Sequence, residues 1–232
     1  MEGLGLKVLS RLRLDGDEIV LDAGCGSGRV TQALIERLPW GRTIGLDASP
    51  SMVQAARERL GPDADVRVGD LLELELEQPV DAVFSTATFH WISDHERLFA
   101  RLRAALRPGG QLVAQCGGEG NIDTLRGVAN EVLARTPYAE HFRDWRAPWH
   151  YAAPARTRER LLAAGFAEAE CWLTPAPQKP EHPREFLATI VLGPHVQQLP
   201  EPLRDPFMDD VLDALGEPVV VDYVRLNIDA TA

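Results

Sequence analysis

The chain has 232 residues, of which 45% are apolar, and it carries a formal net charge of −11. This length is enough for one globular domain with a full hydrophobic core, and no apolar stretch approaches the roughly 20 residues that span a bilayer. Nucleic acids bind mainly to Lys and Arg, so an acidic chain without a basic run is a poor match for them. Residues 1–14 lack the continuous apolar core of a signal peptide. We therefore expect a cytoplasmic protein, either a monomer or a homodimer, that binds neither a membrane nor nucleic acid.

Strand and helix patterns alternate through the first half of the chain. Residues 1–14 have the composition of an amphipathic helix. Strands are predicted at 19–23, 43–47, 64–68, 80–85 and 111–116. Helices are predicted between them at 27–38, 49–60 and 93–106, where apolar residues recur at helical spacing and Ser49-Pro50 and Ser93 give start signals. This alternation predicts a parallel sheet covered by helices on both faces.

The pattern is less regular after Gly120. Helices are predicted at 121–135, 157–164, 184–192 and 201–215, and strands at 168–173 and 219–228. Residues 136–155 are rich in aromatic residues without a clear period, and residues 175–183 are rich in proline. We predict one domain over 1–232, in which 1–18 form a short N-terminal helix. The segments 121–165 and 175–217 are predicted to be helical and loop embellishments that form a small cap over the site.

A glycine-rich loop follows the first strand, where residues 19–28 read IVLDAGCGSG. Glycine has no Cβ, so its backbone can approach a ligand closely, and strand, glycine loop and helix together form a nucleotide-binding unit. Arg29 stands where a dinucleotide fingerprint has glycine or alanine, and no P-loop lysine lies nearby. The spacing therefore favours a nucleoside-like ligand without a pyrophosphate.

Four motifs in this order resemble those of the class I S-adenosylmethionine-dependent methyltransferases. They are residues 20–29 (VLDAGCGSGR), 44–52 (IGLDASPSM), 68–71 (VGDL) and 106–113 (LRPGGQLV). Residues 89–95 (FHWISDH) are more similar to the trans-aconitate methyltransferase branch, which methylates small carboxylic acids. The resemblance implies an α/β fold with a Rossmann-like, doubly wound sheet of seven strands, the last one antiparallel and formed by 219–228.

The resemblance also implies S-adenosyl-L-methionine as cofactor and a set of residues that bind it. These are Asp22, Gly24, Gly26, Gly28, Asp47, Ala48, Met52, Asp70, Leu71 and Thr86. Asp22 is expected to reach the ammonium group of the cofactor, Asp47 the two ribose hydroxyls and Asp70 the adenine amino group. Each has a structural alternative: Asp22 as a cap of the glycine loop, Asp47 as a helix N-cap, and Asp70 as part of an ordinary surface turn. Met52 is expected on the adenine face, with core packing as its alternative.

The acceptor side of the site is expected from two later segments. His90 is the candidate catalytic residue, as a general base, an orienting donor or simply a loop histidine. Candidate substrate-binding residues are Trp91, Arg143, Arg146 and Trp149, with core packing or a hydrophobic plug with solvated arginines as the alternative. A carboxylate acceptor needs no base, whereas a hydroxyl acceptor does. The expected reaction is methyl transfer to a small-molecule acceptor, most simply a carboxylic acid similar to trans-aconitate.

Two other functions stay open at this point. An NAD-dependent oxidoreductase could use a similar sheet, although Arg29 and Asp70 argue against it. A cofactor-binding protein with weak or no transferase activity is the other alternative, because only about 18 residues precede the first strand. Many relatives have a longer segment there that covers the cofactor, so we expect part of this lid to be missing or supplied by 136–155. The three dispersed cysteines have no metal-binding spacing, and no metal is expected.

Overall fold

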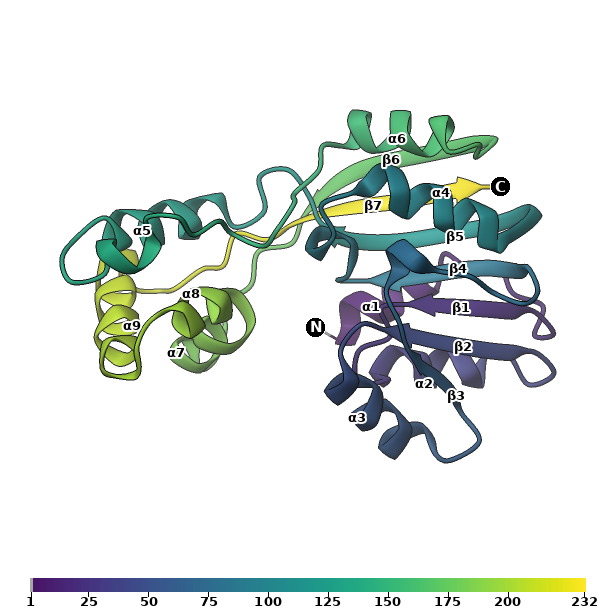
Figure 1. Cartoon of the computed structure of the whole chain (residues 1–232), viewed down its shortest axis with the longest axis horizontal. Helices are drawn as coiled ribbons and strands as arrows, with labels where there is room; N and C mark the ends of the chain where they lie inside the picture. The colour runs from purple at the N-terminus through teal and green to yellow at the C-terminus, as the bar shows by residue number, and fades with distance from the viewer. Residues whose placement is uncertain (1) are drawn as a thin grey trace. The chain divides into compact units, whose positions relative to one another are not determined.

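The computed structural model describes residues 2–232, and contacts within the chain divide it into two compact units (Figure 1). The first unit comprises the chain up to Glu119, His150–Thr174 and Arg225–Ala232. The second comprises Gly120–Trp149 and Pro175–Val224. The two predicted embellishments largely coincide with the second unit, and their assignment to one domain over 1–232 stays a prediction.

The first unit is built on a seven-stranded sheet with the order β3-β2-β1-β4-β5-β7-β6. Its strands are β1 (Ile19–Ala23), β2 (Arg42–Asp47), β3 (Asp65–Val68), β4 (Val80–Thr86), β5 (Leu106–Gly117), β6 (Glu168–Pro175) and β7 (Val224–Thr231). Neighbouring strands from β3 to β5 pair in parallel, whereas β7 pairs antiparallel with β5. The doubly wound α/β sheet with an antiparallel last strand, expected from the sequence, is therefore confirmed.

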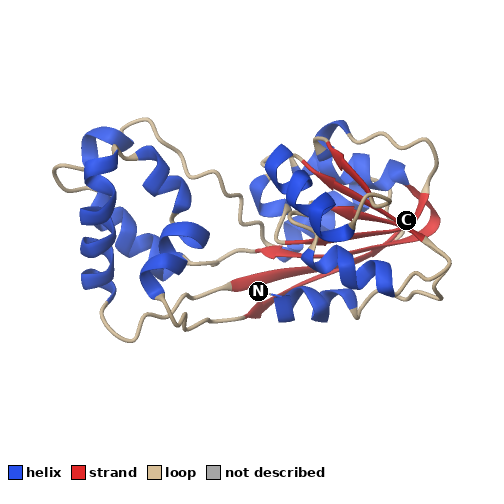
Figure 2. Ribbon diagram, turned by 90° about the horizontal axis from the view of Figure 1, so that it is seen from below, coloured by secondary structure: helices blue, strands red, loops and turns tan. Residues whose placement is uncertain are grey.

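Helices cover both faces of this sheet (Figure 2). They are α1 (Glu2–Leu9), α2 (Arg29–Glu36), α3 (Pro50–Leu60), α4 (His95–Ala105) and α6 (Pro154–Ala163), with 3-10 turns η1 (Leu71–Glu73) and η2 (Phe89–Trp91). Adjacent residues of β1 face opposite sides, as expected for a strand. Val20 lies in one apolar cluster with Val8 and Leu34, and Leu21 in another with Leu98. Val20 and Leu21 are both fully buried, so β1 contributes to the hydrophobic core on each face of the sheet.

Three helix ends show the turn chemistry expected from the sequence. Ser49 caps α3 by accepting from the Met52 N–H at 3.4 Å, and Gly61 ends that helix with φ 93°. The cap of α4 is Asp94, which accepts from the Arg97 N–H at 2.9 Å, one residue later than the predicted Ser93 start. The strand-to-helix turns expected from the sequence are therefore present, with shifts of one or two residues.

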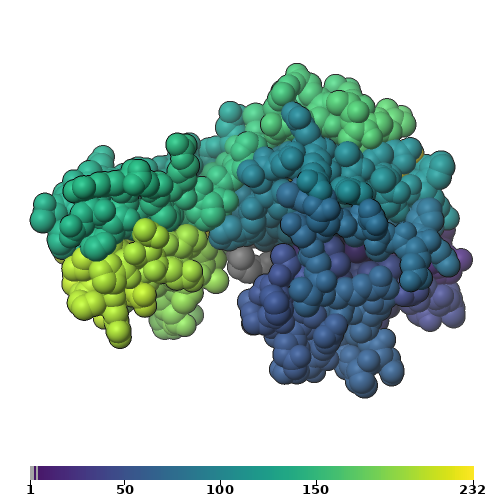
Figure 3. All heavy atoms as spheres, viewed as in Figure 1, coloured from purple at the N-terminus to yellow at the C-terminus, as the bar shows by residue number. Residues whose placement is uncertain are grey.

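The second unit is helical. It contains α5 (Asp123–Leu133), η3 (Ala139–Phe142), α7 (Pro183–Phe186), the π-helical turn η4 (Leu187–Val191), α8 (Gly193–Gln198) and α9 (Glu201–Leu215). Its core lies between α5 and α9, where Leu125, Val132, Phe207 and Val211 are fully buried. Figure 3 shows these two segments side by side on the surface. No helix within residues 2–232 is long and apolar enough to cross a membrane.

The last predicted strand begins later than expected. Residues 219–223 alternate buried and less buried side chains, with Val221 fully buried. This segment is paired not with the sheet but with Gln178, through two backbone hydrogen bonds of 2.9 Å between Gln178 and Val221. The alternation of apolar residues over 219–223 therefore does correspond to an extended segment. Its hydrogen-bond partner lies in the second unit, however, and β7 starts only at Val224.

Candidate active site

A cavity of about 850 Å³ opens at the carboxyl ends of the central strands in the first unit. Its walls come from the loops after β1, β2, β3 and β4, as expected where a doubly wound sheet binds ligands. The volume is in the upper part of the range for small-molecule sites, about 300–1,000 Å³. The structure brings together ten residues singled out by sequence: Asp22, Gly24, Gly26, Asp47, Ala48, Met52, Asp70, Leu71, Thr86 and Trp91.

The glycine loop lies against this cavity, and its glycines differ in what they do. Gly24 has φ 85°, and a Cβ there would lie 2.1 Å from the Thr88 hydroxyl oxygen, so only glycine fits. Gly26 has φ 54° and lines the cavity, and a Cβ on it would meet no protein atom within 4 Å. Gly28 does not line the cavity; it is buried, with Ala56 at 3.2 Å from its Cβ position, and begins α2. The backbone at Gly26 is therefore not covered by protein side chains and is open to a ligand in the cavity.

Asp22 is a buried carboxylate at the end of β1 and lines the cavity. Its Oδ2 accepts a hydrogen bond of 2.7 Å from the Thr31 hydroxyl. Burial raises its pKa to about 7, the hydrogen bond from Thr31 opposes that shift, and the nearby charge of Asp47 adds to it. Within residues 2–232 no Lys, Arg or His forms an ion pair with Asp22. A cationic ligand group in the cavity would stabilise its ionised form.

Asp47 ends β2 and is held by two backbone donors. Its Oδ2 accepts from the Gly26 N–H and its Oδ1 from the Ser49 N–H, both at 2.9 Å. Each oxygen keeps a second lone pair, so the oriented carboxylate can still accept from a ligand hydroxyl. The N-cap of α3 is Ser49, so Asp47 is not the helix cap that was its structural alternative. Its structural role is instead to hydrogen-bond both the glycine loop and the loop after β2.

The loop after β3 supplies Asp70 and Leu71. The Asp70 Oδ1 accepts from the Leu72 N–H at 2.9 Å and so caps the turn η1, while the residue lines the cavity. Asp70 is therefore part of a turn, as its structural alternative predicts, and its position in the cavity wall also allows it to bind a ligand. Met52 on α3 is 44% exposed and lines the same cavity, so core packing does not account for it.

The loop after β4 has an unusual backbone. Ala87 has φ 57° and donates its N–H to the Gln115 carbonyl at 2.8 Å. An alanine in this left-handed conformation costs about 1–2 kcal/mol, and such strain is often found at functional sites. Ala87 lines the cavity between Thr86 and Thr88. The loop is thus held in one conformation at the expected reacting end of the site.

His90 is buried and lies outside the set of residues that line the cavity. Its Nδ1 accepts from the Gly117 N–H at 3.3 Å, and its carbonyl accepts from the His150 N–H at 2.7 Å. Burial lowers its pKa to about 3, with the charge of Arg225 adding to the effect. His90 is therefore neutral at neutral pH and is a poor general base. Of its three roles, the geometry favours a loop histidine that fixes the turn carrying Trp91.

The remaining predicted acceptor residues are divided between the units. Trp91 is 47% exposed and lines the cavity of the first unit. Arg143 and Arg146 belong to the second unit and are exposed. Trp149 also belongs to that unit, and its ring lies 5.6 Å from the His195 ring. Of these four residues, the structure therefore places only Trp91 in the cavity of the first unit, and the acceptor roles of all four stay predictions.

The sequence did not single out several residues that line the cavity. They are Cys25, Ser27, Arg29, Val30, Leu46, Ser49, Gly69, Leu72, Ile92 and Ser93, whereas Ala87 and Thr88 were expected beside Thr86 after the fourth strand. Most lie next to a predicted residue in the same loop, so extending each motif by one or two positions would have found them. Arg29, which argues against a dinucleotide, also lines the cavity and is the one cation among the described lining residues, where Asp22, Asp47 and Asp70 supply three carboxyl groups.

The chain is similar to known proteins over most of its length. A family model described as "Methyltransferase domain" matches residues 20–110. A protein named trans-aconitate 2-methyltransferase from Variovorax paradoxus (strain S110) is 32% identical over 230 residues, covering 95% of this chain and 86% of the relative. One of the same name from Mycobacterium tuberculosis (strain ATCC 25177 / H37Ra) is 31% identical over 217 residues, covering 91% and 81%.

Solved structures share the fold. A putative methyltransferase from Bacillus halodurans C-125 superimposes with a TM-score of 0.65 at 17% identity, covering 97% of each chain. The [4+2]-cyclase SpnF superimposes with a TM-score of 0.64 at 20% identity, covering 99% of this chain and 80% of that one. At such low identity the likeness establishes the fold alone, and the different names show that this fold carries more than one kind of chemistry.

Proposed function

Because this chain belongs to the class I S-adenosylmethionine-dependent methyltransferases, we propose that its acceptor is a small carboxylic acid similar to trans-aconitate. The methyl donor is S-adenosylmethionine, and the chain is a methyltransferase. The observation that carries the acceptor class is the match with relatives named for trans-aconitate, which extends over 95% of this chain at 32% identity.

The charge of the cavity supports the donor and argues against NAD. Three carboxylates line it, those of Asp22, Asp47 and Asp70, and Arg29 is the one cation among the described lining residues. A pyrophosphate would be repelled there, whereas a ligand that carries a sulfonium and an ammonium group is attracted, and these positive groups, once bound, also favour an anionic acceptor beside them. The cofactor, when bound, supplies a methyl group already activated for transfer.

We assign roles in binding that follow from the positions of these residues. Asp47, oriented by the Gly26 and Ser49 N–H groups, accepts from the ribose hydroxyls. Asp70 accepts from the adenine amino group beside Met52, and Leu71 offers its backbone N–H to the ring. Asp22 pairs with the ammonium group, which offsets the cost of burying its charge. The open cradle at Gly26 lets the backbone approach the ligand.

The composition of the cavity also supports an acceptor that needs no base. Among the described lining residues there is no His, Lys or Tyr, the three carboxyl groups are assigned to the cofactor, and burial lowers the pKa of His90 to about 3. A carboxylic acid is ionised at neutral pH and attacks without losing a proton, whereas an alcohol or phenol requires a positioned base. The protein then contributes alignment and exclusion of water, for which Trp91 and Ile92 form an apolar wall.

The test is a panel of acceptors with one labelled donor. Purified protein is incubated with S-adenosylmethionine and trans-aconitate, smaller di- and tricarboxylates, or catechols, and the products are identified by mass spectrometry. We expect methyl esters of carboxylic acids and no methyl ethers. Binding of S-adenosylhomocysteine, measured by calorimetry on the same sample, separates the two parts of the proposal. Binding together with methyl ethers alone would disprove the acceptor class, and absence of binding would disprove the assigned cavity.

A further inference from the structure

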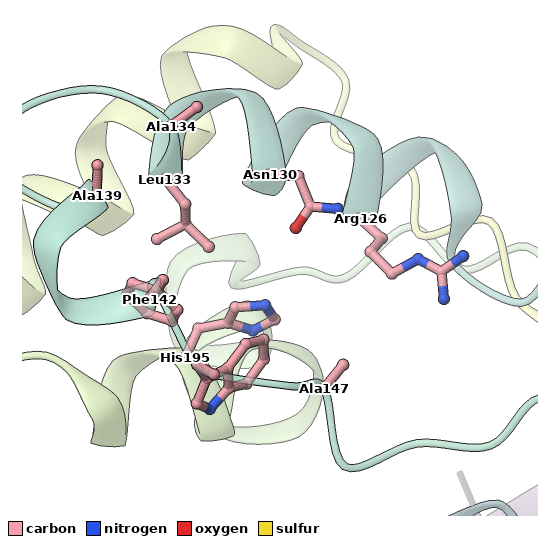
Figure 4. A pocket seen from close by; sticks show the side chains of 9 residues that line it. Arg126, Asn130, Leu133, Ala134, Ala139, Phe142, Ala147 and His195 are labelled. Atoms are coloured by element: carbon pink, nitrogen blue, oxygen red, sulfur yellow. The ribbon is translucent and has the colours of Figure 1, made fainter.

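A second cavity, of about 410 Å³, lies wholly within the helical unit (Figure 4). It is formed by one face of α5, by residues 139–147 and by α8. Its volume is within the range of small-molecule sites. Methyl transfer, as derived above, assigns no role to this cavity or to the residues that line it.

The α5 wall is polar at one end and apolar at the other. Arg126, Asn130, Leu133 and Ala134 lie at positions i, i+4, i+7 and i+8, so they share one face of the helix. Figure 4 shows Arg126 and Asn130 towards one end and Leu133 towards the other. Arg126 pairs with Asp123 at 2.7 Å, and Asp123 is not among the residues that line the cavity. No acidic residue is among the described lining residues, and the guanidinium of Arg126 has five N–H donors, so it can bind an anion in the cavity as well as Asp123.

Flat rings form the opposite wall. The His195 ring on α8 lies 4.5 Å from the Trp145 ring and 6.1 Å from the Phe142 ring, and the Phe142 and Trp145 rings are 5.2 Å apart. Figure 4 shows His195 across the cavity from Leu133 and Asn130. Aromatic faces of this kind favour a flat, apolar body in the space beside them.

His195 adds a buried, neutral ring to the aromatic wall of the cavity. The residue is only 1% exposed, and its Nδ1 has no hydrogen-bond partner within residues 2–232. Burial lowers the pKa of the ring to about 4, so it is neutral at neutral pH and offers one donor and one acceptor. The Nδ1 atom itself is not accessible from the cavity, so His195 contributes the face of its ring to the wall and no hydrogen bond to the ligand.

We propose that this cavity binds a small carboxylic acid with a flat, apolar carbon skeleton. The carboxylate pairs with the Arg126 guanidinium and accepts from the Asn130 amide. The skeleton lies between Leu133 and the rings of Phe142 and Trp145. This site is a binding site in its own right, and its existence does not require methyl transfer.

The test uses the full chain and trans-cinnamate, which combines a carboxylate with a flat ring system. Isothermal titration calorimetry is expected to show one saturable site. Cinnamyl alcohol, of the same shape without the charge, is expected to bind at least about tenfold more weakly, because the charge-assisted contact is lost. Arg126→Gln is expected to weaken cinnamate binding by at least about tenfold as well. Arg135→Gln is the matched control, since Arg135 is exposed and outside the cavity.

A second variant tests the cavity without disturbing the core. Ala147 lines the cavity and is exposed, so Ala147→Phe fills the space while the buried packing stays intact. We expect it to abolish cinnamate binding with unchanged circular dichroism. Asp47→Ala, which affects only the cofactor cavity, is expected to leave cinnamate binding unchanged. Equal binding of acid and alcohol, or binding that survives both Arg126→Gln and Ala147→Phe, would overturn the proposal, as would loss of binding in Asp47→Ala alone. Ala147→Phe is expected to bind S-adenosylhomocysteine as the native chain does, so a loss of cinnamate binding can be told apart from a failure of the proposed function.

Discussion

Asp47→Asn tests the assigned cofactor cavity most sharply, because it changes one oxygen of a carboxylate that binds two backbone N–H groups and is proposed to bind the ribose as well. In the native chain both oxygens accept from backbone N–H groups, of Gly26 and Ser49, at 2.9 Å. An asparagine amide nitrogen can accept from neither and would face one of these donors. The ribose contact also loses its charge. The variant keeps the size and shape of the side chain, so packing is expected to change little.

The size of the effect follows from the hydrogen bonds that are lost. Hydrogen bonds to charged groups contribute about 1.5–3 kcal/mol each. Loss of the charged ribose contact and part of the loop support is expected to cost about 2–4 kcal/mol of binding free energy, or about 30- to 1,000-fold in Kd. Calorimetric titration with S-adenosylhomocysteine measures this directly. Asp63→Asn is the control, since Asp63 is exposed and outside the cavity. An affinity within twofold of the native chain would refute the assignment of Asp47.

Three further outcomes are expected. Gly24→Ala places a Cβ within 2.1 Å of the Thr88 hydroxyl oxygen at φ 85°, so urea unfolding should show a free energy of unfolding that is lower by about 2–4 kcal/mol. Gly26→Ala, whose Cβ would meet no protein atom within 4 Å, should lower it by only about 1 kcal/mol. Equal losses in the two variants would contradict the close contact between Gly24 and Thr88. Burial raises the pKa of Asp22 from 3.8 to about 7, so the folded chain binds more protons than the unfolded one between these values. Its contribution to stability therefore falls as pH rises through that window, and Asp22→Asn should remove this slope; an unchanged slope would count against the burial effect. His90→Gln should lower kcat by less than about tenfold, because a general base contributes about 100- to 10,000-fold; a hundredfold loss would restore His90 as a base.

The sequence predicted which loops line the cavity of the first unit because these loops follow neighbouring parallel strands. The carboxyl ends of such strands meet at one edge of a sheet, so Asp22, Asp47 and Asp70 had to converge once the strand order was right. Turn chemistry was equally local: glycine with positive φ and serine before proline determine their own backbone. Positions defined by short-range rules were therefore predictable to within one or two residues.

The features that the sequence did not predict depend on contacts between distant segments. The environment of His90 is set by Gly117 and Arg225, far along the chain, and no local pattern reports a lowered pKa. The pairing of Val221 with Gln178 gave a strand-like period outside the sheet. The second cavity joins α5 to His195, which the sequence left without a role. In each case burial and partners come from tertiary packing, which a single sequence does not display.

The most direct measurement is transfer of a labelled methyl group from S-adenosylmethionine to trans-aconitate by the purified chain. The product is treated with mild alkali and analysed by mass spectrometry, since an ester releases labelled methanol whereas an ether or a C-methyl product does not. We predict an alkali-labile methyl ester that is formed by the native chain and lost in Asp47→Asn. Label that stays attached to an oxygen, nitrogen or carbon after alkali, or no transfer to any carboxylic acid by a chain that binds the cofactor, would contradict the account.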